Sequence, residues 1–355
     1  MRLVKSPILL LILCGALVHW GCGGGDDDDD SPGDDSSADD NSGDDSSADD
    51  SSGDDGGDTG VNPDGEDHTY VVDSVAVPEN ATDAENLGLD IDGDSMPDNG
   101  LGTLIATLIS VANLDLQTAI TEQVDQGGII LLANLKATDL AEATGVGLYV
   151  YLGADANPAP CENAEDTVCR HHLDGTGTFG IAADSPENAL IVGENAGGAF
   201  TGGPGEVTIE LALADGADPL SLTLVNAKAE ATVAADGLSS GKLGGAVTQD
   251  EINNNILPAV ADIVAGIVAA DPTCTLGPPD CCEDGTAKTV LGFLDDDGDC
   301  VVSVEELQSN SLLSTLLTPD VDLFDAAGNP GTDGTDDSLS LGIGFTAVGG
   351  GFTPP

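Results

Sequence analysis

An acidic segment late in the chain carries the residues best suited to chemistry. It has the sequence DDDGDCVVSVEE from Asp295 to Glu306. Its carboxylates and its serine hydroxyl concentrate hard oxygen donors within one short stretch. Calcium is a hard cation that takes six to eight oxygen ligands, so calcium binding is the chemistry this segment favours. The alternative is an ordinary acidic surface turn.

The segment resembles an EF-hand loop, in which positions 1, 3, 5, 7, 9 and 12 supply the ligands. The resemblance implies a bidentate carboxylate at position 12 and a backbone carbonyl at position 7. The residues at these positions are Asp295, Asp297, Asp299, Val301, Ser303 and Glu306. Val302, at position 8, is the apolar residue expected to anchor the loop inward.

Position 6 departs from the EF-hand pattern because it holds Cys300 instead of glycine. The sharp turn there needs a positive φ, which strains a residue that has a side chain. We therefore predict a disulfide that holds Cys300, with Cys274, Cys281 or Cys282 as its partner. Such a bond would make the site rigid.

A second acidic segment, DIDGDSMPDN, runs from Asp90 to Asn99. It is similar to the aspartate-rich calcium repeats of dockerins and thrombospondin type 3 modules. The ligands implied are Asp90, Asp92, Asp94, the carbonyl of Met96, and Asp98. Position 12 is Leu101, so the bidentate acid is missing and we expect a lower affinity. The alternative is an acidic turn in which Asp98 or Asn99 caps a helix that begins at Leu101.

Helices and strands must position these segments. Apolar spacing predicts helices over 101–109, 116–124, 287–294 and 304–317, and a capping box at Thr248 and Glu251 begins another over 248–267. Apolar and polar residues alternate in many short strands, at 70–77, 129–135, 146–152, 176–181, 189–192, 207–213, 220–224, 227–233 and 339–345. We therefore expect a mainly β chain with several helices (α+β), built as a sandwich-like domain with an EF-hand-like insertion.

The amino-terminal region predicts export. A basic start and the apolar run Ile8–Val18 fit a signal peptide over residues 1–21 and are too short for a spanning helix. Cys22 resembles the lipidated cysteine of a bacterial lipoprotein. Residues 26–58 repeat a unit close to SGDDSSADDS and cannot bury a core, so we expect a disordered acidic tether over 22–66. The calcium-binding domain would span 67–355, with a possible internal boundary near 248 and a helical, EF-hand-like part over 248–320.

Charge limits the partners. Seven Lys and Arg face 65 Asp and Glu, which gives a net charge of −58. Such a chain repels nucleic acid, so we expect no nucleic-acid partner. The leader and Cys22 instead predict a lipid anchor in the outer membrane or at the cell surface, with the periplasmic face as a further possibility. A protein or glycan partner stays open. The layout is similar to that of surface lipoproteins of deltaproteobacteria.

No catalytic motif stands out, so we expect a structural or binding role. The alternative is a surface hydrolase or adhesin that uses calcium to order its binding face. The even number of cysteines after the leader predicts three disulfides, and Cys161 with Cys169 suits a local loop. A zinc site formed by these two cysteines with His171 and His172 is a further alternative.

Overall fold

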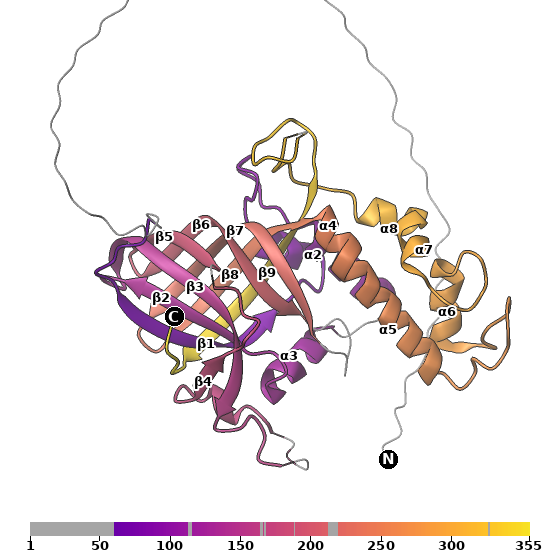
Figure 1. Cartoon of the computed structure of the whole chain (residues 1–355), viewed down its shortest axis with the longest axis horizontal. Coiled ribbons are helices and arrows are strands. Elements are labelled where there is room, and N and C mark those ends of the chain that lie inside the picture. Colours follow the sequence, from indigo (N-terminus) through magenta and orange to yellow (C-terminus); the bar gives the residue numbers. More distant parts are fainter. Residues whose placement is uncertain are drawn as a thin grey trace, which may run out of the picture. The chain divides into compact units, whose positions relative to one another are not determined.

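The long strands pair with one another in a closed ring (Figure 1). The structure is a computed structural model, and it describes residues 60–112, 116–163, 166, 168–187, 189–211, 219–325 and 327–355. Eight antiparallel strands form the barrel in chain order. They are β1 (Glu66–Ala76), β2 (Leu131–Ala137), β3 (Glu142–Asn157), β5 (Leu190–Ala196), β6 (Ala199–Leu211), β7 (Leu220–Ala234), β8 (Gly237–Thr248) and β9 (Ser338–Gly349). A short strand, β4 (Thr178–Ile181), pairs with β3 outside the ring.

The ring closes because β1 pairs with both β2 and β9 and because β2 also pairs with β3. The prediction of a sandwich is therefore wrong, whereas the prediction of a mainly β chain agrees with the structure. Alternating apolar residues show only that one face of a strand is buried. They do not distinguish two packed sheets from one sheet that closes on itself.

Apolar side chains fill the barrel. Val207 and Ile209 of β6 and Leu222 and Leu224 of β7 are buried. A cavity of about 30 Å³ remains between apolar residues of β1, β2, β3, β6, β8 and β9, which is room for about one water molecule. An eight-stranded barrel has an interior just wide enough for side chains to fill.

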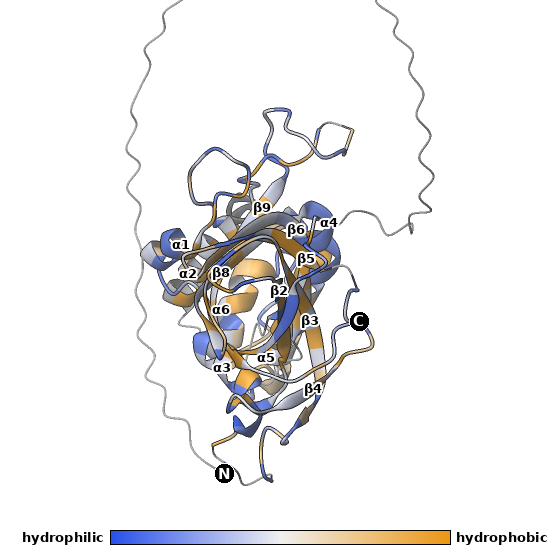
Figure 2. Cartoon of the chain, turned by 90° about the vertical axis from the view of Figure 1, so that its left-hand side faces the viewer, coloured by the Kyte–Doolittle hydropathy of each residue, from blue (hydrophilic) through white to orange (hydrophobic). Residues whose placement is uncertain are grey.

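The outer wall of the barrel is polar where it is not covered. On β6 and β7, most residues that alternate with the buried ones are polar, such as Glu210, Thr223 and Lys228. Hydrophilic and hydrophobic residues accordingly share the strands in Figure 2.

Short helices cover parts of the barrel. The first three helices are α1 (Ala81–Leu87), α2 (Gly100–Ala112) and α3 (Leu116–Gln126). Helix α2 packs against β9, and α3 packs against β1. Asn80 caps α1 by accepting hydrogen bonds from the amides of Thr82 and Asp83.

A second group of helices follows β8. Thr248 caps the first of them and accepts a hydrogen bond from the amide of Glu251, as predicted. The Glu251 carboxylate does not complete the capping box and accepts a hydrogen bond from the amide of Thr223 instead. The group consists of α4 (Gln249–Glu251), a π-helical turn (Ile252–Ile256), α5 (Leu257–Ala270), α6 (Gly285–Leu294), α7 (Val304–Ser309) and α8 (Ser311–Leu316).

The continuous helix Gln249–Ala270 is long and apolar enough to cross a membrane by length and composition alone, and 17% of its apolar window is buried. It packs against α6 and α7, and its exposed positions include Asn254 and Asp262. These polar positions are those of a helix at the surface of a folded domain. A π-helical turn precedes Pro258, which has no backbone N–H to donate to the preceding turn.

Candidate metal centre

The loop between α6 and α7 brings its carboxylates together. One oxygen from each of Asp295, Asp297 and Asp299 lies within 4.8 Å of the others, so this group could hold a metal ion. Backbone amides order the three side chains. The amide of Gly298 donates to Asp295 Oδ1 at 2.8 Å, that of Asp299 to Asp297 Oδ1 at 3.1 Å, and that of Val301 to Asp299 Oδ1 at 2.9 Å.

The second loop repeats this arrangement. Asp90, Asp92 and Asp94 also place one oxygen each within 4.8 Å of the others. The amide of Gly93 donates to Asp90 Oδ1 at 2.7 Å, that of Asp94 to Asp92 Oδ1 at 3.0 Å, and that of Met96 to Asp94 Oδ1 at 2.7 Å. In both loops, therefore, the carboxylates at positions 1, 3 and 5 accept hydrogen bonds from the backbone amides at positions 4, 5 and 7, respectively.

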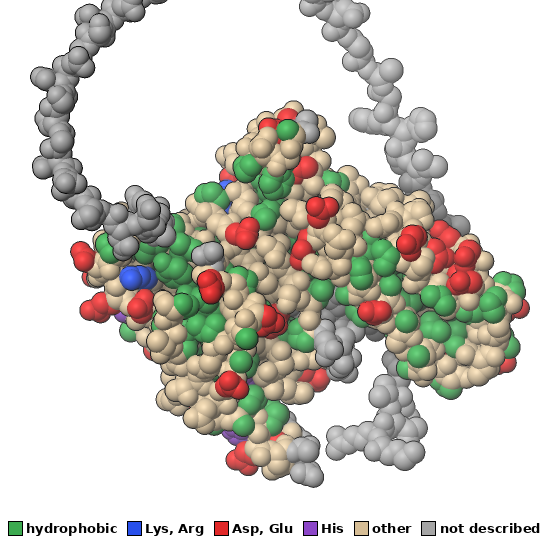
Figure 3. Space-filling view, viewed as in Figure 1, with side chains coloured by type: hydrophobic (Ala, Val, Ile, Leu, Met, Phe, Trp, Pro, Cys, Tyr) green, Lys and Arg blue, Asp and Glu red, His purple; other side chains and the backbone are tan. Residues whose placement is uncertain are grey.

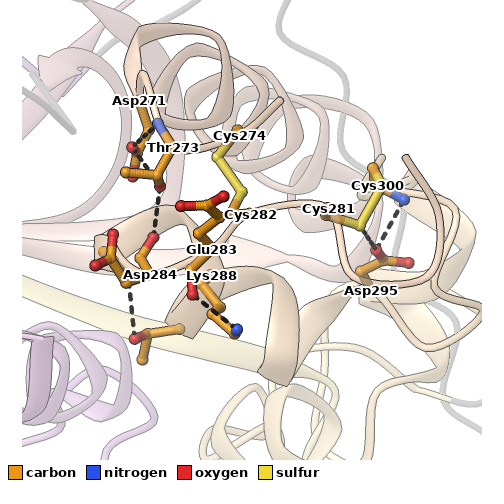
Figure 4. The surroundings of a disulfide bond; sticks show 12 residues. Asp271, Thr273, Cys274, Cys281, Cys282, Glu283, Asp284, Lys288, Asp295 and Cys300 are labelled. Atoms are coloured by element: carbon orange, nitrogen blue, oxygen red, sulfur yellow. Dashed lines mark hydrogen bonds between the residues drawn. A yellow bond between two sulfur atoms is a disulfide. The ribbon is translucent and has the colours of Figure 1, made fainter. Parts of the chain in front are cut away.

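Position 6 also has the same backbone conformation in the two loops. Cys300 and Ser95 both have a φ of 74°, in the left-handed region. Cys300 is bonded to Cys281, so the predicted disulfide is confirmed and its partner is settled (Figure 4). The amide of Cys300 donates to Asp295 Oδ2 at 2.9 Å.

Glu306 and Ser303 complete the first loop. Glu306 Oε1 accepts from the amides of Asp296 and Asp297 at 3.0 and 3.4 Å, and Oε2 accepts from the amide of Ser303 at 2.8 Å. The position-12 carboxylate is thus folded back over the start of the loop. Val302 is buried, as predicted, while Val301 is 59% exposed.

The sequence leaves two roles open for the second loop, an acidic cluster and a helix cap. Asp98 takes part in the first and Asn99 in the second. Asp98 Oδ2 accepts from the amide of Ile91 at 2.6 Å, so Asp98 belongs to the loop. Asn99 Oδ1 accepts from the amide of Gly102 at 3.0 Å and caps α2. The cap and the acidic cluster are therefore both present.

Two residues of β7 hold the second loop against the barrel, and the sequence did not indicate either of them. Lys228 Nζ donates to the carbonyl of Asp90, and Asn226 Nδ2 donates to the carbonyl of Ile91 at 2.6 Å. Asn226 has a φ of 51° and interrupts the regular strand. A basic residue in so acidic a chain was the available sign for Lys228.

Electrostatic repulsion is concentrated in both loops. Loss of hydration, followed by the charges of Asp299, Glu306 and Asp295, raises the pKa of Asp297. Loss of hydration, with Asp92 and Asp94 adding smaller contributions, raises the pKa of Asp98 to about 6. Acidic side chains gather over α6 and α7 on the face shown in Figure 3. A bound cation would remove this repulsion, and the donors of both loops are oxygens, as calcium prefers.

The raised pKa of Asp98 gives a pH dependence. A carboxyl whose pKa is higher in the folded state stabilises the fold below its unfolded pKa, 3.8, and loses that contribution as the pH rises through about 6. In the presence of a chelator, Asp98→Asn should therefore gain free energy of unfolding relative to the parent protein as the pH rises from 4 to 7. Urea denaturation at several pH values measures this difference. A difference between the two proteins that stays constant with pH would contradict the prediction.

The other four cysteines in the part of the chain that the structure describes also form disulfides. Cys161 pairs with Cys169, as predicted, and Cys274 pairs with Cys282. The first bond removes both thiolates from the zinc alternative. His171 Nε2 lies 3.0 Å from Asp166 Oδ2, while His172 is fully buried against Phe179.

The amino-terminal predictions lie outside the described residues. These are the signal peptide over 1–21, the lipidation of Cys22, and the tether as far as residue 59. The last part of the expected tether is described, and there the amide of Asn62 donates to the carbonyl of Gly145 at 2.8 Å. The folded domain thus includes residues before 67.

Comparison with known proteins gives no relative from which to transfer a function. The chain matches no protein-family model, no curated protein and no solved structure. The geometry of the two loops is therefore the basis for proposing a function.

Proposed function

We propose that this protein is an exported, lipid-anchored, calcium-binding protein with a structural or binding role. The observation that carries the proposal is the repeated loop. The segments 90–98 and 295–306 lie far apart in the chain, and each of them gathers three aspartates. The arrangement of the three side chains and the hydrogen bonds to their carboxylates are the same in both segments. An acidic turn needs no such repetition, whereas a hard cation needs oxygens gathered at one point.

The distribution of positive charge supports the same proposal. Arg170 pairs with Asp73 and Asp125, at 3.4 and 2.5 Å. Lys228 and Lys288 donate to backbone carbonyls and not to carboxylates. None of these three basic side chains pairs with an aspartate of the two loops, so those aspartates are open to a cation from solution, and calcium would stabilise the fold by neutralising them.

The anchor is proposed from the amino-terminal sequence. The three disulfides favour an oxidising compartment, which agrees with export. A lipid on Cys22 would then hold the barrel at a membrane surface through the acidic tether.

Calorimetric titration with calcium tests the proposal. We expect two sites per chain, the tighter one at 295–306, because Glu306 supplies the position-12 carboxylate there. Glu306→Gln should abolish the tighter site, and the exposed neighbour Glu305→Gln should leave it unchanged. Deleting residues 26–58 should leave both sites in place. Loss of binding in that deletion would instead assign calcium uptake to the tether, and absence of heat in the parent protein would refute the proposal.

A further inference from the structure

The bond between Cys281 and Cys300 joins two residues that both have unfavourable backbone conformations. Cys281 has a φ of 47° and Cys300 a φ of 74°. Left-handed backbone is costly for residues other than glycine, so each cysteine needs external support to stay there. Their Cα atoms lie 5.4 Å apart, and the disulfide is the link that holds the pair.

The disulfide connects the metal loop to a rigid support. Cys281 and its neighbour Cys282 are both buried, and Cys282 is bonded to Cys274. The carbonyl of Cys281 also accepts a hydrogen bond from the amide of Leu276 at 3.1 Å. Position 6 of the loop is therefore fastened to a segment that is itself closed by a second disulfide.

This support reaches a ligand residue directly. The amide of Cys300 donates to Asp295 Oδ2, and Figure 4 shows Asp295 beside the Cys281–Cys300 bond. When Cys300 is held at positive φ, its amide points at the position-1 carboxylate. If Cys300 relaxed to negative φ, this hydrogen bond would be lost and Asp295 would be free to turn away from Asp297 and Asp299.

We propose that the Cys281–Cys300 disulfide is a redox control on calcium binding by the loop 295–306. This deepens the proposed function and rests on it. In the reduced protein, Cys300 would relax from positive φ, and calcium binding would have to restore the ordered loop. Because this ordering uses part of the binding energy, the affinity for calcium would fall on the order of tenfold. The site would then reach full affinity only after the disulfide has formed, as it does in an oxidising compartment.

The redox step is an ordinary thiol–disulfide exchange with a dithiol. The dithiol is oxidised to its own disulfide, and its two electrons and two protons convert the Cys281–Cys300 bond into two thiols. The reverse reaction restores the bond. Cys281 is buried and Cys300 is partly exposed, so a reductant approaches the bond from the side of Cys300.

The second loop supplies a comparison within the same molecule. Ser95 holds the same φ of 74° at position 6 without a disulfide, in a loop that Lys228 and Asn226 fasten to β7. In the loop 295–306 the corresponding attachment is the disulfide. Calcium binding at 90–98 should therefore not respond to a dithiol.

Two variants of the full chain separate the disulfide from the other effects of reduction. Both contain Cys281→Ser. One adds Cys300→Ser, which has no support at positive φ, and the other adds Cys300→Gly, which needs none. With Ca²⁺ as the probe, the serine variant should bind about tenfold more weakly at 295–306 than the oxidised parent protein. The glycine variant should bind within about threefold of the parent and ignore dithiol.

A metal-free measurement makes the test independent of calcium. Amide hydrogen exchange at position 300, measured in chelator, should be faster in the serine variant than in the parent, because the bond to Asp295 is broken. Equal affinity and equal exchange in the parent and the serine variant would overturn the redox proposal and leave calcium binding intact. Absence of calcium binding at 295–306 in the oxidised parent would overturn the proposed function and the redox control together. Unchanged binding at 90–98 shows that each variant is folded.

Discussion

Replacing Leu224 with alanine should lower the free energy of unfolding by about 3 kcal/mol. Leu224 is fully buried in the barrel and lies opposite Val207 of β6. On its other side is β8, where Gly245 has no side chain to move into the space. A Cβ placed on Gly245 would lie 2.9 Å from Leu224 Cβ. The cavity left by the substitution therefore stays largely empty, and an unfilled cavity adds to the loss of buried apolar surface.

The same substitution at an exposed position serves as the control. Leu276 is 43% exposed, in the segment that follows α5, and Leu276→Ala should change the free energy of unfolding by less than about 1 kcal/mol. Urea denaturation at saturating calcium measures both variants under conditions in which the metal loops contribute equally. Similar losses in the two variants would show that the barrel interior is not the main apolar core.

The sequence identified most of the strands and missed the one that completes the ring. β8 contains Gly241, Gly244 and Gly245, and glycine both weakens the alternating pattern and has low strand propensity. Some of these glycines are required by packing between neighbouring strands. A Cβ on Gly241 would lie 2.6 Å from the ring of Phe345 in β9. Local composition therefore indicates a loop at β8, whereas tertiary packing makes a strand.

The alternating residues predict strands over 220–224 and 227–233, on either side of Asn226. The structure shows one strand from Leu220 to Ala234 in which Asn226 has positive φ and shifts the register against β8. The irregularity has a local use, since Asn226 is also the residue that holds the loop at Ile91. A pattern of apolar residues cannot show which strand lies beside which, so closure of the barrel could not be predicted.

More of the candidate site could be predicted than of the fold, because its residues are close in sequence. The spacing of Asp295, Asp297 and Asp299 was enough to predict that they meet, and Cys300 at a position that needs positive φ was enough to predict its disulfide. The contact of Lys228 with Asp90 was not predictable, since 138 positions separate the two residues. Short-range geometry is encoded in spacing, whereas long-range contacts depend on the fold.

Asp297→Asn should have opposite effects on stability without and with calcium. In chelator at pH 7 the variant should be more stable than the parent. The raised pKa of Asp297 means that its ionised form disfavours the fold once the pH exceeds that pKa, and asparagine cannot ionise. With calcium at a hundredfold excess over the dissociation constant of the loop, the parent gains about 2.7 kcal/mol from binding. The variant lacks a charged ligand and should gain much less, so the order of the two melting temperatures reverses.

Asp296→Asn is the matched control for this reversal. Asp296 is exposed, adjacent to Asp297, and at a loop position that supplies no ligand. The substitution Asp296→Asn also removes one negative charge from this loop. A gain in stability that came only from weaker charge repulsion would therefore appear in both variants. Thermal unfolding of the two variants and the parent, each with chelator and with calcium, gives the comparison. If Asp296→Asn lost the calcium response as fully as Asp297→Asn, calcium would be acting as a diffuse counter-ion of an acidic surface. A reversal confined to Asp297→Asn requires an ion coordinated at the position where the three aspartates converge.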